Sequence, residues 1–477
     1  MSQSAALRLR LVILGLMCIP ALTAGGCNCG SRDGSDDNQG LPSPGTLQFS
    51  AAAMSVSEYI GTVTVQVNRA GGSLGAVDVT YSTSGGTATA GTDYTAANGT
   101  LSWADGVTTA QTFPITITDD LLADNAETIV VSLTNPTGGA TVGGSLTITL
   151  IDIWTKFPGN PVLGPSAGSW DDGGVLGPSV VQLGPNSYEI FYQAGGTNFN
   201  DSIGRATSTD GITWTKTGTL PVFTPVRPNG AGLLTAGTFD DDAILRPCVV
   251  YDLSAPVNER YRMWYTGFDL IDDGMGGLAL NAVGIGRATS PDGITWTPMN
   301  PRNPVLTNGP AGRFDEVAVA FASVINDAGN LKMWYTGFNT TGPSAIGYAT
   351  STTGGASWTP NATAVYTGGG AAFEVSGPSD PWVIKDGVFY RMFYTGERPD
   401  ATAGQVVWNV GYARSPDGIT GWAPFAGNPA LTPSTSGWDS TDVFFPCLLR
   451  DGTSLKVWYT GTSGNGATGR DGLATNP

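Results

Sequence analysis

Histidine is absent from this chain of 477 residues. Without an imidazole, the sequence excludes the Ser-His-Asp arrangement of nucleophilic catalysis and the commonest kinds of zinc site. Any acid–base chemistry in this protein must therefore use carboxylates, tyrosines or lysines.

Charged residues are scarce, at 13% of the chain, and only 22 Lys and Arg stand against 39 Asp and Glu, for a net charge of -17. The chain lacks the basic face that nucleic acid requires, so we expect no nucleic-acid partner. An acidic surface suits divalent cations or neutral glycans. Long charged helices are missing, whereas 68 glycines and 31 prolines indicate many short strands joined by turns. The length allows two or three domains.

The N-terminus has the features of an export signal. Arg8 and Arg10 precede LVILGLMCIPALTA, an apolar run too short for a stable membrane anchor. The following AGGCNCG resembles a bacterial lipobox, which makes Cys27 the expected lipidated first residue of the mature protein. We predict a signal peptide at 1–26, a polar tether at 27–44 and a location in the bacterial cell envelope, with the lipid as the only contact with the membrane. Cleavage and release from the cell is the alternative.

Residues 45–153 alternate between apolar and polar side chains with a period of two, as in GTVTVQVNR, VDVTYSTS and ETIVVSLTNP. Turn residues separate these runs at short intervals, which predicts an all-β sandwich. The phrases VSEYIGTVTVQVNRAGG, GTATAGTDYTAANGTLSWADG and ITDDLLADNAETIVVSLTNPTGGA resemble the Calx-β domain over its whole length. The resemblance implies an immunoglobulin-like sandwich at 45–153.

In the Calx-β family, acids at one end of the sandwich coordinate calcium. The matching positions in this sequence are Glu58, Asp93, Asp119, Asp120, Asp124, Glu127 and Asp152. Ca²⁺ takes about six to eight oxygen ligands, and clustered carboxylates repel one another unless a cation lies among them. The resemblance therefore implies Ca²⁺ as a cofactor. The alternative is a calcium-free adhesion module, because Asp152 stands alone where the family often closes with a run of acids.

Beyond residue 153 the chain repeats itself. One phrase recurs as YEIFYQAGG (188–196), YRMWYTGFD (261–269), LKMWYTGFN (331–339), YRMFYTGER (390–398) and LKVWYTGTS (455–463). The repeats are long enough for a four-stranded blade with loops, and five of them predict a five-bladed β-propeller at 154–477. The fifth repeat ends at DGLATNP, before its fourth strand, and IWTKFPGNPVL (153–163) matches the fourth-strand phrase ITWTPMNPRNPVL. We therefore expect the start of the propeller to complete its last blade and leave almost no linker between the domains.

Residues that recur in every blade are expected to be scaffold, because a site on one axis needs blades that differ. This applies to an acid that follows an aromatic residue before each blade: Asp171, Asp240, Asp315, Glu374 and Asp439. It also applies to the turns at Asp210, Asp292 and Asp417, which resemble the Asp-box turns of sialidases. Cys248 and Cys447 occupy matching places in two repeats, too far apart to bridge, and we expect buried free thiols.

The blades differ just before a recurring Pro-x-Val phrase or its variant, in what should be the innermost strand. The differing residues are Gly177, Arg246, Phe321, Asp380 and Phe445. We expect them near the mouth of the central funnel, where charged groups suit sugar hydroxyls and aromatic faces suit the sugar ring. Arg246, Phe321, Trp382 and Phe445 are the residues expected to bind substrate.

The five blades, with NPVL, DPWVIKDGVFYRMFYTG and SPDGITW, resemble the glycosidase superfamily of arabinanases, β-xylosidases, levansucrases and invertases (families 43, 32 and 68). That resemblance implies carboxylate catalysis on the innermost strands. It assigns Asp380 as base or nucleophile, Glu316 as general acid and Asp242 as the acid that modulates them. Two hypotheses remain: a carbohydrate-active hydrolase, and a non-catalytic surface protein that binds a glycan or a partner. Gly177-Pro178, where family 43 typically has Asp-Pro, favours the second, and the varied funnel residues favour the first.

Overall fold

The computed structural model describes residues 43–122, 126–195, 201–225, 238–272, 278–299, 302–400, 406–452, 454–464 and 468–476. These residues form strands and two short 3-10 helices, η1 (Glu58–Ile60) and η2 (Val257–Glu259). In this part of the chain, no helix has the length and apolar character needed to cross a membrane. The expected all-β class is confirmed.

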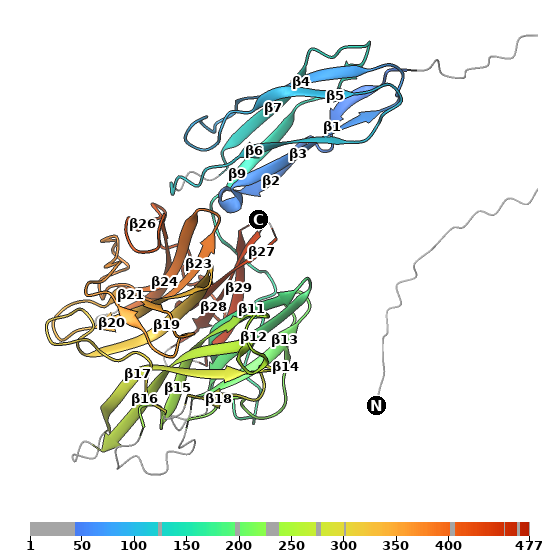
Figure 1. Ribbon diagram of the computed structural model, residues 1–477. Coiled ribbons are helices and arrows are strands. Elements are labelled where there is room, and N and C mark those ends of the chain that lie inside the picture. The colour runs from blue at the N-terminus through green and yellow to red at the C-terminus, as the bar shows by residue number, and fades with distance from the viewer. Residues whose placement is uncertain are drawn as a thin grey trace, which may run out of the picture.

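The N-terminal domain is a sandwich of two sheets (Figure 1). One sheet has the order β6-β3-β1-β8, from Gln111–Thr116, Thr62–Ala70, Thr46–Phe49 and Thr141–Val142. The other has the order β2-β9-β7-β4-β5, from Ala53–Ser57, Leu146–Ile151, Thr128–Thr134, Val77–Gly85 and Asn98–Trp103. The period-two pattern explains the packing: along β3, Val63, Val65 and Val67 are buried while Thr62, Thr64 and Gln66 face solvent.

The C-terminal domain is a ring of five four-stranded antiparallel sheets (Figure 1). Blade 1 comprises β11 (Val175–Gly184), β12 (Ser187–Ala194), β13 (Ser202–Ser208) and β14 (Thr215–Lys216). Blade 2 comprises β15 (Ala243–Tyr251), β16 (Tyr261–Asp272), β17 (Leu278–Ser290) and β18 (Thr297–Pro298). Blade 3 comprises β19 (Ala318–Asp327), β20 (Asn330–Phe338), β21 (Ala345–Ser351) and β22 (Thr359–Pro360). Blade 4 comprises β23 (Ser379–Asp386), β24 (Phe389–Pro399), β25 (Val406–Ser415) and β26 (Ala423–Pro424).

Blade 5 closes the ring with strands from both ends of the domain. It comprises β27 (Asp442–Asp451), β28 (Ser454–Thr462), β29 (Arg470–Asn476) and β10 (Thr155–Lys156), with β10 antiparallel to β29. The first strands of the blades, β11, β15, β19, β23 and β27, contact one another around the axis. The strand at 153–163 therefore completes the last blade as predicted, which leaves no unpaired edge at the junction.

The recurring acids tie the strands of a blade together. In blades 2 to 5 the acid accepts a hydrogen bond from the tyrosine hydroxyl of the repeated phrase: Asp240–Tyr265, Asp315–Tyr335, Glu374–Tyr394 and Asp439–Tyr459. In blades 1 and 5 it also pairs with a lysine of the fourth strand, Lys216 with Asp171 and Lys156 with Asp439. These acids are scaffold: they join strands within one blade, and Glu374 also accepts a hydrogen bond from the hydroxyl of Tyr366, in the loop after blade 3, at 3.4 Å.

The Asp-Gly turns join neighbouring blades. Asp210 accepts hydrogen bonds from the backbone N–H groups of Ile212 and Thr213, which fixes the turn. The carbonyl of Gly211 then accepts a hydrogen bond from Trp458 Nε1 of blade 5, at 3.0 Å. Equivalent bonds run from Trp264 to Gly355 and from Trp334 to Gly418. The repeated tryptophans are thus buried links between blades.

Cys248 and Cys447 belong to a second set of links around the axis. Cys248 Sγ accepts a hydrogen bond from Val324 N of the next blade, and Cys447 Sγ accepts one from Val180 N, each at 3.2 Å. Ser179 and Ser323 do the same in their blades, for Val249 N and Val383 N at 2.9 Å. Both cysteines are buried and free, as predicted, because each serves as a small hydrogen-bond acceptor between blades.

The sandwich is held against blades 4 and 5 by buried side chains. Tyr59 of η1 lies between Trp154 and Tyr412, with ring centroids 6.0 and 5.5 Å away. Asp119 pairs with Arg391 and accepts a hydrogen bond from the Tyr412 hydroxyl at 3.0 Å. The interface therefore combines aromatic packing with a buried ion pair, in agreement with the restricted orientation expected from the short linker.

Candidate functional site

The innermost strand of every blade carries a bulge at the position where the blades differ. Gly177, Arg246, Phe321, Asp380 and Phe445 all have positive φ angles, between 49 and 59°. The pairing register of each first strand with the second shifts at this point. A bulge re-aims a side chain out of the alternating pattern of a strand. Four residues other than glycine are held in this unfavourable conformation, which is typical of functional positions.

A ring of side-chain oxygens holds these bulges in place. The backbone N–H of each bulge residue donates to an oxygen on the second strand of the preceding blade. The donor and acceptor pairs are Gly177 to Thr460, Arg246 to Gln193, Phe321 to Thr266, Asp380 to Thr336, and Phe445 to Thr395. The threonine of the repeated Tyr-Thr-Gly phrase thus acts as a hydrogen-bond acceptor between blades. It fixes the strained residue of the neighbouring blade.

Arg246 extends across the axis, over the bulge of blade 1. A Cβ atom built on Gly177 would lie 2.7 Å from Arg246 Cδ, so glycine at this position makes room for the arginine. The guanidinium carbon lies 4.5 Å from the ring centroid of Phe445, and Nε lies 3.8 Å from Asp380 Oδ1. Arg246 is 4% exposed, and burial lowers its pKa while Asp380 opposes that shift. Four of the five predicted funnel residues therefore meet around this one guanidinium.

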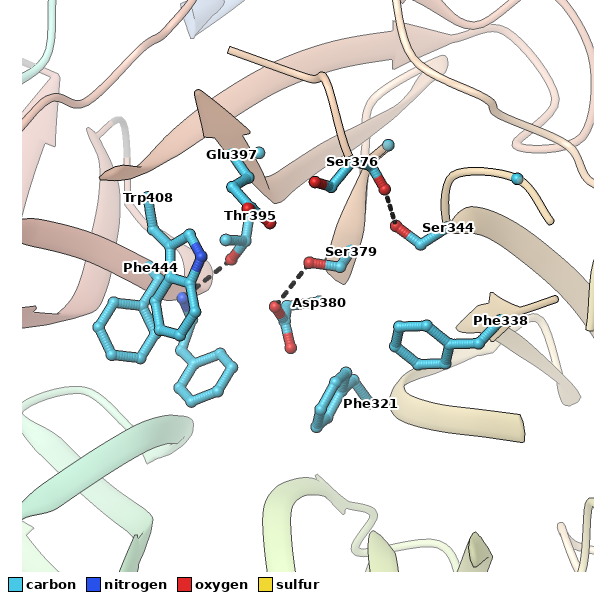
Figure 2. A pocket seen from close by; sticks show the side chains of 14 residues that line it. Phe321, Phe338, Ser344, Ser376, Ser379, Asp380, Thr395, Glu397, Trp408 and Phe444 are labelled. Atoms are coloured by element: carbon cyan, nitrogen blue, oxygen red, sulfur yellow. Dashed lines mark hydrogen bonds between the residues drawn. The ribbon is translucent and has the colours of Figure 1, made fainter. Parts of the chain in front are cut away.

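A cavity of about 380 Å³ opens beside Asp380, between blades 3, 4 and 5 (Figure 2). A continuous aromatic wall forms part of its lining: Phe338, Phe321, Phe445, Phe444 and Trp408. Neighbouring rings in this series have centroids 4.6 to 6.4 Å apart. The polar side chains of the lining come from Ser344, Ser376, Ser379, Asp380, Thr395 and Glu397. An apolar wall with a few convergent polar groups is typical of a small-molecule site.

Asp380 and Glu397 are the two carboxyl groups that line this cavity. Asp380 is 4% exposed, and its Oδ2 accepts a hydrogen bond from Ser379 Oγ at 2.9 Å. Burial raises the pKa of Asp380, and the charge of Arg246 acts against that rise. Glu397, on β24, is half-buried at the cavity wall (Figure 2). The cavity therefore holds two acids in unlike surroundings, which is the arrangement that separates an acid from a base.

Glu316 and Asp242, the other predicted catalytic acids, do not line the cavity. Glu316 lies at the surface, where Thr340 Oγ1 and Gly312 N donate to its carboxylate at 2.6 and 2.5 Å. These bonds lower the pKa of Glu316, the reverse of what a general acid needs. Asp242 is buried in blade 2, and its Oδ2 accepts a hydrogen bond from Leu270 N at 2.7 Å. Local hydrogen bonds fix both side chains away from the cavity. The structure therefore does not bring Glu316 and Asp242 together with Asp380, as the sequence had led us to expect.

Of the residues predicted to bind substrate, Phe321 and Phe445 line the cavity. Arg246 lies behind Asp380 and is itself no part of the lining. Trp382 is 7% exposed, and its Nε1 donates to the carbonyl of Leu448 in the next blade at 2.9 Å. Trp382 therefore belongs to the same inter-blade links as the cysteines, because the bulge at Asp380 turns the next side chains of β23 toward the core.

At the base of the sandwich, some of the predicted calcium residues do come together. Glu58 is 2% exposed, and burial, followed by the charge and hydrogen bond of Asp152, raises the pKa of Glu58 to about 10. Asp119 and Asp120 contribute smaller effects in the same direction. Asp120, Glu127 and Asp152 each have a carboxylate oxygen removed from solvent. A cation beside Glu58 and Asp152 would relieve the repulsion between their carboxyl groups.

The remaining predicted calcium residues are engaged differently. Asp93 Oδ2 accepts a hydrogen bond from Thr89 N at 2.5 Å, within its own turn. Asp119 is paired with Arg391, and Arg414 lies 3.5 Å from the same oxygen, so propeller cations occupy it. Asp124 and Cys27 lie outside the described residues. Within the part of the chain that the structure describes, no group of three or more Asp, Glu, His or Cys side chains is arranged to hold a metal ion.

Two acids, one at the cavity and one buried in blade 5, escaped the sequence reasoning. Glu397 stands where the repeated phrase has Phe268 in blade 2 and Phe338 in blade 3. Asp471, buried in β29, the third strand of blade 5, stands where the other blades have isoleucine or valine. Both are departures from the repeat. Comparing every position of the five blades, and not just the innermost strand, would have revealed them.

Comparison with known proteins finds a family match for the N-terminal residues. Residues 42–153 match the family model of the Calx-beta domain. The crystal structure of an apo-form Calx CBD1 domain is 32% identical, covers 22% of this chain and 96% of its own, and has a TM-score of 0.22. An uncharacterized protein of Mycobacterium tuberculosis (strain CDC 1551 / Oshkosh) is 30% identical over 191 residues, 36% of this chain and 59% of that protein. The chain thus matches less than two thirds of that relative's length.

The propeller resembles those of glycoside hydrolases. A structure described as a glycoside hydrolase is 18% identical, covers 66% of this chain and 91% of its own, and has a TM-score of 0.47. At this identity the likeness concerns the fold alone. What the funnel does must be argued from its own residues.

Proposed function

We propose that this is an exported, glycan-directed protein whose cavity between blades 3, 4 and 5 takes a sugar unit. The observation that carries the proposal is the buried Asp380, set in a bulge at the floor of an aromatic-lined cavity of about 380 Å³. Aromatic faces stack on the apolar faces of sugar rings, and a carboxylate accepts hydrogen bonds from sugar hydroxyls. The acidic chain suits neutral glycans, and it disfavours phosphate-rich partners.

We propose that the same cavity hydrolyses a glycosidic bond, with Asp380 and Glu397 in the two carboxyl roles. Asp380, whose pKa burial raises, suits the proton donor to the leaving oxygen. Glu397, in its half-buried place, suits the base that takes a proton from water as water attacks the anomeric carbon. These roles differ from those expected from the sequence, where Asp380 is base or nucleophile and Glu316 the acid.

The experiment is hydrolysis of a panel of 4-nitrophenyl glycosides by the full chain and three variants. Asp380→Asn and Glu397→Gln are each expected to lower kcat/KM by about 10²-fold or more, because each removes a proton-transfer group. Glu316→Gln is the matched control and is expected to leave the rate unchanged. Loss of activity in Glu316→Gln with normal activity in Glu397→Gln would restore the sequence-based assignment and reject ours.

A binding function without catalysis is the second candidate. The ion pair between Asp380 and Arg246 favours it, since an acid held by a guanidinium is a poorer proton donor. Glycan binding in the cavity together with no turnover of any glycoside in the panel would establish this alternative.

For the sandwich we propose Ca²⁺ held by Glu58, Asp120, Glu127 and Asp152, with Asp119 committed to Arg391. Hard oxygen ligands are what Ca²⁺ prefers, and its charge would stabilise the clustered carboxylates. Addition of Ca²⁺ should raise the melting temperature of the wild-type chain and leave that of Glu58→Gln/Asp152→Asn unchanged. We further propose that the chain is exported and anchored through lipid on Cys27. Mass spectrometry of the mature N-terminus distinguishes lipidation from simple release.

A further inference from the structure

Asp471 interrupts the fivefold pattern at a position that is apolar in the other four blades. Each blade forms one isolated bridge between its third strand and the loop after its fourth strand. The third-strand members of these bridges are Ile203, Ile285, Ile346, Val410 and Asp471. A carboxyl group thus replaces a β-branched hydrocarbon in one of the five blades.

The carboxyl group of Asp471 is fully buried and only half satisfied. Its relative exposure is 0%, and Oδ1 accepts a hydrogen bond from Thr460 Oγ1 at 2.9 Å. Oδ2 has no hydrogen-bond partner among the described residues. Burying a carboxylate without full compensation is costly, and isoleucine would fit the same place at no such cost. The scaffold alone therefore gives no reason for Asp471.

Arg246 is the cation that interacts electrostatically with Asp471. The charge of Arg246 stabilises the ionised form of Asp471, and it does the same for Asp380. The guanidinium is fully desolvated, and its Nε and Nη1 atoms make no hydrogen bond within the described residues. One cation thus lies within electrostatic reach of two buried acids, of which Asp380 alone lines the cavity.

We infer that Asp471 is a positioning residue that shares the Arg246 guanidinium with Asp380, so that the protonation of Asp471 sets how strongly the cavity carboxyl is held ionised. When Asp471 is neutral, Arg246 acts on Asp380 alone and favours its ionised form. When Asp471 is ionised, it competes for the same cation and adds a negative charge, and both effects favour the protonated form of Asp380. The inference rests on the proposed function only in taking Asp380 as the carboxyl that a ligand meets.

Asp471 is the carboxyl group of this cluster that we expect to titrate near neutral pH. Burial raises the pKa of Asp471 to about 7, against the lowering effects of Thr460, Arg246 and Lys216. The other ionisable groups that interact with this cluster are Tyr192, Cys248 and Cys447, and burial raises the pKa of each of them. These three stay neutral near pH 7. Lys216 is paired with Asp171, so Asp471 is the group whose charge changes near neutrality.

The test is a ¹³C NMR titration of carboxyl-labelled aspartate in the full chain, from pH 4 to 9. The Asp380 resonance is assigned by its loss in Asp380→Asn, and the Asp471 resonance by its loss in Asp471→Asn. The coupling appears in whichever of the two acids titrates at the higher pH, because only then is the other acid ionised. An Asp380 that titrates after Asp471 is expected to have its pKa lowered by about 0.5 unit or more in Asp471→Asn, and an Asp471 that titrates after Asp380 is expected to show the same fall in Asp380→Asn. Asp471→Val, which installs the residue of blade 4, is expected to give the same Asp380 titration as Asp471→Asn, because charge and not the amide is the cause.

Titrations of Asp380 and Asp471 that each stay the same when the other acid is replaced would overturn the inference. So would a wild-type Asp471 that stays ionised across the whole range. Circular dichroism and melting temperature show whether each variant is folded, and two replacements of different chemistry guard against one misfolded variant. No ligand is needed, so the outcome is independent of glycan binding. A shifted Asp380 in a chain that binds no glycan would reject the proposed function and leave this inference standing.

Discussion

The side chain of Arg246 passes so close to Gly177 that a Cβ atom there would lie 2.7 Å from Arg246 Cδ. The arginine of blade 2 can therefore take this position because blade 1 has a glycine at residue 177. The family resemblance leads one to expect an aspartate at residue 177, but in this chain the space above that bulge belongs to a guanidinium. The buried carboxyl group beside this guanidinium lies instead on blade 4, at Asp380.

Gly177→Ala tests this relationship. A left-handed residue with a Cβ costs roughly 1–2 kcal/mol, and the collision with Arg246 adds to that cost. Gly168, which also has a positive φ (70°) but nothing within 4 Å of a built Cβ, provides the control. Urea unfolding should show Gly177→Ala to be less stable than Gly168→Ala by about 1 kcal/mol or more. Equal losses in the two variants would mean that Arg246 does not need the glycine.

Asp471 predicts how stability depends on pH. A carboxyl group whose pKa rises from 3.8 to about 7 on folding binds its proton more tightly in the folded state. It therefore stabilises the fold fully below the ordinary pKa, and this stability is lost as the pH rises through about 7. In Asp471→Asn the fall in unfolding free energy between pH 4 and 7.5 should be smaller by on the order of 2–4 kcal/mol. Parallel stability curves for wild type and variant would contradict the buried, neutral form of Asp471.

Arg391→Met tests the contact between the two domains. Arg391 is 4% exposed and pairs with Asp119 of the sandwich, so its loss leaves a buried carboxylate without its main partner. Breaking a buried pair in this way costs about 3–5 kcal/mol. Calorimetry is expected to show a single transition for the wild type and two for Arg391→Met. The matched control is Arg262→Met, which breaks the Arg262–Asp252 pair inside blade 2 and should keep a single transition. A single, unshifted transition in Arg391→Met would show that aromatic packing alone joins the domains.

Cys248→Ser should be tolerated, with a loss of under about 1.5 kcal/mol, because Ser179 and Ser323 make the same inter-blade hydrogen bond. Cys248→Val has a similar volume but cannot accept the bond from Val324 N, and it should lose more stability. The comparison is made by urea unfolding. A valine variant as stable as the serine variant would mean that the thiol contributes by packing and not as an acceptor.

The repeats predicted the propeller well because each blade packs the same kinds of side chain at the same positions of its four strands. The blade boundaries, the closing strand near Thr155 and the scaffold role of the recurring acids all follow from one phrase seen five times. The differing residues Arg246, Asp380 and Phe445 do mark the axis, since the bulge occurs at the same point of every innermost strand.

The pairing of acids could not be predicted from spacing. Glu316 is close to a blade in sequence, but its loop turns it toward Thr340. Glu397 lies inside the repeated phrase at 390–398, where it departs from the phenylalanine of blades 2 and 3, on the strand next to that of Asp380. Likewise, Asp119 and Arg391 are 272 positions apart in the sequence, and no local sequence pattern predicts their contact. The family resemblance concerns the sandwich alone and does not show the contact with the propeller. Asp119 was therefore predicted to bind calcium, although it pairs with Arg391.

We propose above that the aromatic cavity beside Asp380 takes a sugar. The most direct measurement is saturation-transfer NMR of the full chain with a set of neutral oligosaccharides, repeated with Trp408→Ala and Asp380→Asn. Trp408 is 37% exposed at the cavity wall, so its removal should weaken a stacked sugar by about tenfold or more without unfolding the protein. Saturation is expected to pass from the wild-type protein to at least one sugar, and this transfer is expected to be lost in both variants. A sugar that binds both variants as well as the wild type would show that this cavity is not the binding site.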